Sequence, residues 1–158
     1  KGSNQIAKKP ILINDLKAII NKIDEISKSD KKKLRDKAII LLGFSGGFRR
    51  SELVNIEFED VEFVSEGVKI FVKRSKTDQS GEGMIKAIPY FENKLFCPVT
   101  KLKDWINFIE IKSGKIFEIS DKSVSLIIKK YASYAGLDPF TLFIPCKFSI
   151  IIGCFVSR

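Results

Sequence analysis

The stretch Gly43–Ile56, GFSGGFRRSELVNI, decides the fold of the chain around it. Two adjacent glycines, Gly46 and Gly47, follow a long apolar run. A glycine pair ends a helix because glycine adopts left-handed backbone geometry at little steric cost. The residues after the pair predict a second, short helix over about Arg49–Asn55. The turn between these helices therefore places an arginine where the chain changes direction.

Two amphipathic helices are expected up to this turn. Their apolar residues recur three and four positions apart, which places them on one helix face. The recurring positions are Leu16, Ile19, Ile20 and Ile23 in the first helix, and Leu34, Ala38, Leu41 and Leu42 in the second. Asn14 is the expected N-cap of the first helix, which ends near Ser27, and Ser29 or Asp30 is the expected N-cap of the second.

After the turn, the apolar spacing changes from the helical period to a period of two. Residues 61–64, 68–74 and 84–89 are expected strands, because they alternate or run apolar and contain many β-branched side chains. A tight turn at 65–67 and a longer polar connection at 76–83 join them. The three strands are therefore expected to form a small antiparallel sheet.

Two more helices follow, one from Pro98 with its stop at Gly114, and one with Asp121 as its expected N-cap and its stop at Gly136. A length of 158 residues suits one domain with a substantial core. The predicted fold class is α+β, a mainly helical domain with a three-stranded antiparallel sheet.

Positive charge dominates the composition, with 28 Lys and Arg against 19 Asp and Glu and a formal net charge of +9. The expected partner is therefore a polyanion, and among polyanions nucleic acid is expected before any other. The absence of His excludes a Ser-His-Asp triad or a His-ligated metal built from this chain alone. Three cysteines without CxxC spacing are typical of the cytoplasm, and no apolar run approaches the ~20 residues of a membrane span.

Arg49 is the first candidate for binding a phosphate. Its guanidinium and the unpaired N–H groups of a helix start can meet one anion together, and Glu52, one turn on, can hold the arginine in place. Arg50 is a neighbouring candidate for DNA binding. The alternative interpretation is an ordinary surface arginine at a helix N-terminus.

The connection Lys73–Gly83, KRSKTDQSGEG, is the second candidate. Cations and hydroxyls at the tip of a β-hairpin are suited to a phosphate or to the minor groove. The candidate residues are Lys73, Arg74, Ser75, Lys76 and Thr77. The alternative interpretation is a solvated loop with a charged tip.

These segments together resemble a known family. Gly47–Leu53, GFRRSEL, resembles the first-arginine box of the tyrosine recombinases, or phage integrases. Arg74–Gln79, RSKTDQ, resembles the lysine segment of their β-hairpin, and Lys9–Leu16, KPILINDL, resembles the start of their catalytic domain. The order and spacing agree over about residues 9–140.

The resemblance implies cleavage and rejoining of double-stranded DNA through a phosphotyrosine, without a metal or nucleotide cofactor. Arg49 would carry over as the first arginine, which clamps the scissile phosphate. Lys76 would carry over as the acid that protonates the leaving 5′ oxygen. Intact relatives act as tetramers on two duplexes, whereas this chain is expected to be a monomer without a membrane partner.

The end of the chain departs from the family pattern. The family has a His-x-x-Arg box, a second His or Trp and a nucleophilic Tyr after the last predicted helix, but this chain has no His. Its tyrosines, Tyr90, Tyr131 and Tyr134, all come earlier, and the last two are expected to pack within their helix.

Three segments are therefore expected: a linker remnant at 1–9, a partial catalytic domain at 10–140, and an atypical tail at 141–158 from a shifted or decayed reading frame. The first prediction is a recombinase remnant that binds DNA without cleaving it. A non-catalytic DNA-binding protein that uses the same basic surface is the alternative. A chain that folds poorly because its apolar tail is exposed is the third.

Overall fold

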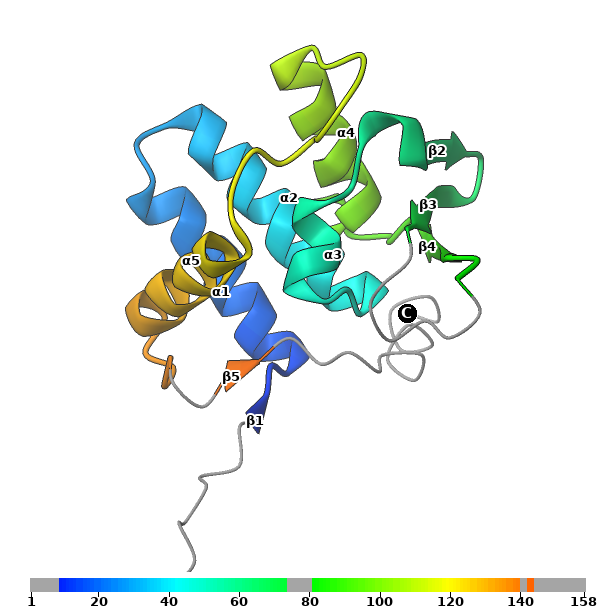
Figure 1. The fold of residues 1–158 in the computed structure, drawn as a ribbon. Coiled ribbons are helices and arrows are strands. Elements are labelled where there is room, and N and C mark those ends of the chain that lie inside the picture. Colours follow the sequence, from blue (N-terminus) through cyan, green and yellow to red (C-terminus); the bar gives the residue numbers. More distant parts are fainter. Residues whose placement is uncertain (1–8, 74–80, 140–141, 144–158) are drawn as a thin grey trace, which may run out of the picture.

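The computed structural model describes residues 9–73, 81–139 and 142–143 (Figure 1). The helices are α1 (Ile13–Ile26), α2 (Asp30–Gly46), α3 (Arg50–Val54), α4 (Pro98–Ile109) and α5 (Asp121–Tyr134), with short 3-10 turns η1 (Phe58–Asp60) and η2 (Lys94–Phe96). The strands are β1 (Lys9–Pro10), β2 (Val61–Val64), β3 (Gly67–Val72), β4 (Met84–Pro89) and β5 (Leu142–Phe143).

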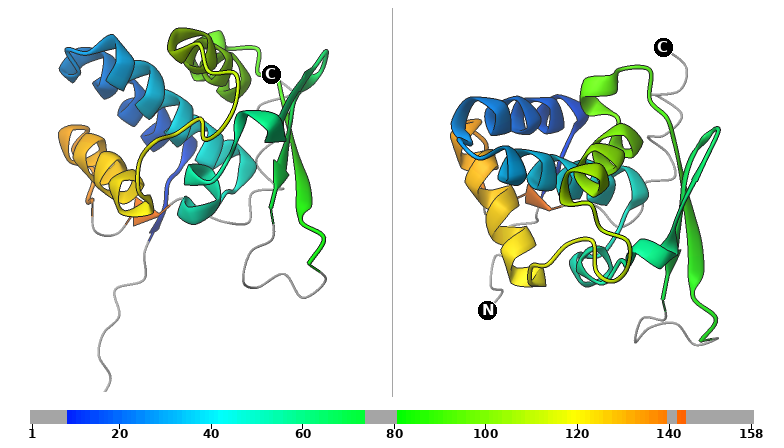
Figure 2. Two further views of the ribbon diagram at one scale, coloured as in Figure 1. Left: turned by 45° about the horizontal axis from the view of Figure 1, so that its top comes forward. Right: turned by 90° about the horizontal axis from the view of Figure 1, so that it is seen from above.

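The predicted fold class is confirmed. Strands β2, β3 and β4 form an antiparallel sheet in that order, with Val61 opposite Ile70 and Val68 opposite Ile88. Figure 2 shows the sheet at one edge of the domain and helices α1 and α5 at the opposite edge. The short strands β1 and β5 pair in parallel and so join the two ends of the described chain.

Helix α2 is the centre of the core. It lies between α1, α4 and α5 and also contacts β4 (Figures 1 and 2). The sequence predicted a single apolar face, but every residue from Asp36 to Ser45 is buried. Each fully buried Leu or Ile side chain contributes roughly 1.5–3 kcal/mol. This packing fixes the end of α2, where the glycine pair lies.

The predicted helix bounds lie close to the observed ones, but the predicted N-caps of α1 and α5 are wrong. Ser29 caps α2 as expected, because its Oγ accepts a hydrogen bond from the Lys32 N–H at 3.4 Å. Helix α1 begins one residue before Asn14, with Leu12 as its N-cap, because the Asp15 carboxylate accepts the Leu12 N–H at 3.2 Å.

Helices α4 and α5 also differ from prediction at one end each. Ser120 rather than Asp121 caps α5, because its Oγ accepts the Ser123 N–H at 3.2 Å. Helix α4 stops well before Gly114, because Glu110 adopts a left-handed conformation with φ 52°. The expected turn residue Gly67 is instead the first residue of β3.

A buried polar cluster joins α2 to α5. The Tyr131 hydroxyl donates to Asp36 Oδ2 at 2.9 Å, and Arg35 Nη2 lies 2.8 Å from Asp36 Oδ1. Burial, with the nearby Asp36 charge, raises the pKa of Tyr131 from 10.0 to about 12. The prediction of helix packing is confirmed for Tyr131 and is wrong for Tyr134, which is 57% exposed because it lies on the outer face of α5.

The predicted linker remnant and atypical tail lie mostly outside the described residues. Two residues of the segment predicted to be atypical, Leu142 and Phe143, form strand β5 and pair with β1. Among the described helices, none has the length and hydropathy required to cross a bilayer.

Candidate nucleic-acid interface

The turn after α2 is shaped by its two glycines, for different reasons. Gly47 takes the left-handed conformation, with φ 57° and ψ 38°, and reverses the chain as the C-cap of α2. Gly46 is required for space: a Cβ there would lie 2.2 Å from Phe48 Cε2 and 3.1 Å from Ile88 Cδ1. The Phe48 ring is 2% exposed and lies against Gly46. The turn is thus anchored to the core immediately before Arg49.

Arg49 is the exposed N-cap residue of α3, and Arg50 beside it is exposed as well. Glu52 Oε2 accepts the Arg49 backbone N–H at 2.8 Å. Glu52 therefore contacts this arginine at its main chain, while its supporting role stays a prediction. That hydrogen bond also corrects the idea that the Arg49 N–H is available to an anion, because a carboxylate already occupies it.

Lys86 on β4 completes this site, and sequence reasoning missed it. Its Nζ donates to the Gly47 carbonyl at 2.9 Å, lies 3.6 Å from Glu52 Oε2, and lies 4.4 Å from the centroid of the Phe48 ring. The signal was the strand alternation, since Lys86 shares a face of β4 with buried Ile88. A lysine on a core-facing position needs a partner for its charge.

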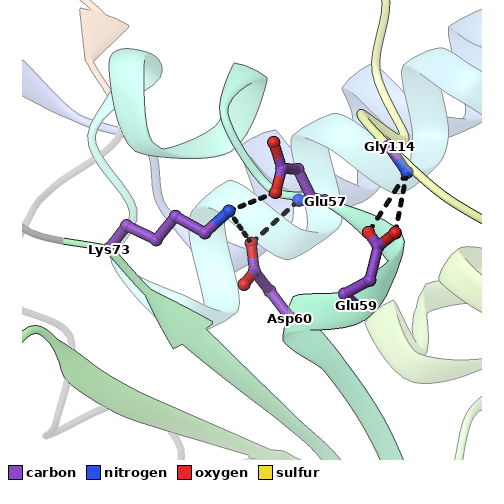
Figure 3. Close-up of polar contacts among 5 residues, drawn as sticks. All are labelled: Glu57, Glu59, Asp60, Lys73 and Gly114. Atoms are coloured by element: carbon purple, nitrogen blue, oxygen red, sulfur yellow. Dashed lines mark hydrogen bonds and ion pairs between the residues drawn. The ribbon is translucent and has the colours of Figure 1, made fainter.

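Lys73, directly after β3, lies in a cluster of carboxylates (Figure 3). Its Nζ forms a hydrogen-bonded ion pair with Glu57 and lies 3.5 Å from Asp60 Oδ2. The hydrogen bond to Glu57 is the main cause that raises the pKa of Lys73. The predicted DNA-binding lysine is therefore already engaged by two negative side chains of the same chain.

The loop after α4 supports this cluster (Figure 3). The Glu59 carboxylate accepts the Gly114 N–H at 3.1 and 3.2 Å, and the Phe58 N–H donates to the Gly114 carbonyl at 2.8 Å. The Ile116 N–H donates to the Ile56 carbonyl at 3.1 Å. These contacts hold η1 in place, and with it the carboxylates that engage Lys73.

The remaining predicted residues of the hairpin, Arg74, Ser75, Lys76 and Thr77, lie outside the described residues. In the sequence they lie between Lys73 and β4, the strand of Lys86. The structure therefore connects the Arg49 turn to the strand that follows the predicted lysine segment.

Residues 11–142 match the phage integrase family. The chain belongs to this family. The resemblance of the Arg49 box and the hairpin segment to the tyrosine recombinases is thereby confirmed at the level of the family, while the roles of single residues stay predictions.

The integrase-family chain is similar to several known recombinases. It is 46% identical over 150 residues to an "Integrase/recombinase xerD homolog" from Selenomonas ruminantium, which covers 87% of this chain and 43% of that protein. It is 32% identical over 117 residues to the tyrosine recombinase XerA of Pyrococcus horikoshii, covering 73% of this chain and 40% of the relative. The chain thus spans less than half the length of these relatives.

Solved recombinase structures share the fold of this integrase-family chain. The pre-cleavage complex of XerH site-specific recombinase bound to difH substrate matches 86% of this chain and 40% of its own, with a TM-score of 0.64 and 18% identity. The crystal structure of XerA recombinase matches 89% and 49%, with a TM-score of 0.63 and 16% identity. The helical core with a three-stranded antiparallel sheet at one edge is therefore an integrase-like core fold.

Proposed function

We propose that this chain is part of a site-specific DNA recombinase and binds double-stranded DNA, with Arg49 against a phosphate. The observation that carries the proposal is the position of Arg49, an exposed arginine on a turn fixed by Glu52, Lys86 and the buried Phe48. Membership of the phage integrase family and a net charge of +9 support it.

The guanidinium is suited to this task because its planar donors bind two oxygens of one phosphate. In the full recombination reaction it would stabilise the charge that develops on the phosphate in the transition state. A turn that is already ordered loses little conformational entropy when the ligand binds. The proposal therefore depends on the rigidity of the turn as much as on the charge of Arg49.

The other predicted residues take secondary roles. Lys76 is proposed as the acid for the leaving 5′ oxygen. Arg50, Arg74, Ser75 and Thr77 are proposed contacts to the DNA backbone. Lys73 is proposed as a weaker contact, because a phosphate would compete with Glu57 and Asp60 for its ammonium group.

We also propose that these 158 residues do not cleave DNA by themselves. Strand cleavage needs an accessible tyrosine and a full set of phosphate-binding residues, and catalytic groups of one site fail together. Tyr131 is 1% exposed and hydrogen-bonded to Asp36, Tyr134 is 57% exposed but comes before the place where the family pattern has its nucleophile, and the sequence contains no His. The proposed state is a monomer in the cytoplasm that needs no metal or nucleotide for DNA binding.

DNA binding is tested with a fluorescent duplex titrated across a salt series. Arg49→Ala should weaken binding by about tenfold or more, since a hydrogen-bonded contact to a charged group contributes about 1.5–3 kcal/mol. The slope of log K against log salt should also become shallower by about 1. Lys76→Ala is expected to act in the same direction.

Lys31→Ala is the matched control. Lys31 is an exposed cation in the first turn of α2, at the opposite end of that helix from the Arg49 turn. This variant should change the affinity less than about threefold, as expected for a distant screened charge. Absence of salt-dependent binding, or an equal loss in both variants, would contradict DNA binding at Arg49.

Cleavage is tested separately with a nicked suicide substrate and a denaturing gel. The expected result is no covalent adduct between protein and DNA. An adduct would contradict the proposed inactivity and would identify this chain as an enzyme rather than a DNA-binding module.

A further inference from the structure

We propose that Lys86 is a positioning residue for Arg49: it fixes the turn that carries the arginine and does not itself contact DNA. The inference rests on the proposed function for the role of Arg49 toward phosphate. It adds a residue from a different element, β4, to the site between α2 and α3.

Three contacts at once hold the ammonium group of Lys86 against the turn. It donates to the Gly47 carbonyl at 2.9 Å, at the residue that reverses the chain. It also lies over the Phe48 ring, 4.4 Å from the centroid, where a cation is attracted to the aromatic face. The third partner is Glu52 Oε2, at 3.6 Å.

Glu52 connects Lys86 to Arg49 through a single atom. The oxygen that faces Lys86, Oε2, is the same oxygen that accepts the Arg49 backbone N–H at 2.8 Å. The charge of Lys86 therefore holds the carboxylate in the position that caps the arginine. Loss of Lys86 should let this carboxylate turn toward water and release the Arg49 N–H.

Burial makes this effect strong. The side chains of Lys86 and Glu52 are only 16% and 11% exposed, so water replaces neither partner easily. A charge left without its partner in such a place is unfavourable. The low exposure of Lys86 also disfavours the competing interpretation, in which its ammonium group binds a phosphate directly.

The position of Lys86 on β4 connects the two candidate segments. Lys86 pairs with Ile70 of β3, and Ile88, two residues on, lies against Gly46 on the same face. Strand β4 is thus fixed to the Arg49 turn at two points. Strand β4 also follows the predicted lysine segment in the sequence. The residue that we propose to position Arg49 therefore lies on the strand that comes after Lys76.

Amide hydrogen exchange without DNA tests the positioning role by itself. In Lys86→Met, which keeps an unbranched side chain one atom shorter and removes the charge, exchange at the Arg49 amide should accelerate by about tenfold relative to the core amide of Ile39, which reports global unfolding. Lys86→Arg should keep most of the protection. Lys69→Met, on an exposed position of β3, is the control and should leave the ratio unchanged.

A double-mutant cycle of DNA affinity tests the connection to Arg49. Lys86→Met should weaken binding by about tenfold in the wild-type background and by less than about twofold in Arg49→Ala. An equal loss in both backgrounds would overturn the proposal and assign Lys86 a phosphate contact of its own.

The two failures are distinguishable. Unchanged exchange at Arg49 in Lys86→Met overturns the positioning role, whatever the DNA result. Accelerated exchange together with no DNA binding by the wild type supports the positioning role and refutes the proposed function.

Discussion

Arg49 and Lys73 are both cations that the sequence predicts to bind DNA, yet carboxylates contact them in different ways. Glu52 accepts a hydrogen bond from the main chain of Arg49 and so fixes where the residue lies. Glu57 and Asp60 contact the ammonium group of Lys73 and so compensate its charge. A carboxylate near a cation can therefore either position it for a ligand or compete with that ligand.

The largest effect should come from filling the space beside the Arg49 turn. Gly46→Ala places a Cβ 2.2 Å from the Phe48 ring and should destabilise the fold by about 2–3 kcal/mol in urea denaturation. DNA affinity should fall about as far as in Arg49→Ala, because both variants remove the arginine from its place.

Gly114→Ala is the control for this substitution. Gly114 has φ +83° but no atom within 4 Å of an added Cβ, so only backbone strain of about 1 kcal/mol is expected. Gly46 has no positive φ, so equal destabilisation by both variants would contradict the requirement for space beside Phe48.

Asp36 is a buried carboxylate that accepts a hydrogen bond from the Tyr131 side chain. It can be compared with the exposed contact between Glu57 and Lys73. Tyr131→Phe should lower the free energy of unfolding by about 2 kcal/mol, because Asp36 loses a hydrogen bond in the core. Urea denaturation at pH 7 measures this loss. A change below about 0.5 kcal/mol would mean that this contact does not stabilise the pair of helices.

The pH dependence of the same pair has a defined sign. Burial raises the pKa of Tyr131 to about 12 in the folded chain, so the unfolded chain loses this proton first. The stabilisation is complete below pH 10 and should be lost progressively as the pH rises toward 12. Denaturation of wild type against Tyr131→Phe isolates it, and parallel declines in both proteins would refute the assignment to Tyr131.

Glu57 and Asp60 compete with DNA for the ammonium group of Lys73 in the proposed complex. Glu57→Gln should increase DNA affinity by about two- to fivefold at low salt, because one competing charge is removed. Glu62→Gln on β2 removes the same charge from an exposed position and should have less effect. Equal gains would mean that only the net charge matters.

The smallest effect is expected for Lys73→Ala. Because carboxylates already engage this ammonium group, the affinity for DNA should fall by less than about threefold, against about tenfold for Arg49→Ala. The same salt titration measures both. A loss as large as that of Arg49→Ala would erase the difference between the two cations.

Much of the fold follows from the sequence, because apolar spacing and glycine positions act locally. The glycine pair at Gly46 and Gly47 marks the end of α2, and the alternation after residue 60 predicts the sheet. The caps at Leu12 and Ser120 were missed by one or two residues, since several nearby polar side chains compete for the same N–H groups.

The site is less predictable, because its contacts cross between elements. Lys86 donates to a carbonyl 39 residues away, and Lys73 reaches Glu57, 16 residues away. Periodicity shows which residues share a face and does not show which element lies opposite that face. Sequence reasoning therefore associated Arg49 with Glu52, which is close in sequence, and did not associate Lys86 with them.

The most direct test is the salt dependence of DNA binding by wild type, Arg49→Ala and Lys31→Ala. If the fixed turn presents Arg49 to a phosphate, Arg49→Ala binds about tenfold more weakly with a salt slope shallower by about 1, and Lys31→Ala stays close to wild type. Identical slopes and affinities in all three proteins would contradict a phosphate site at Arg49.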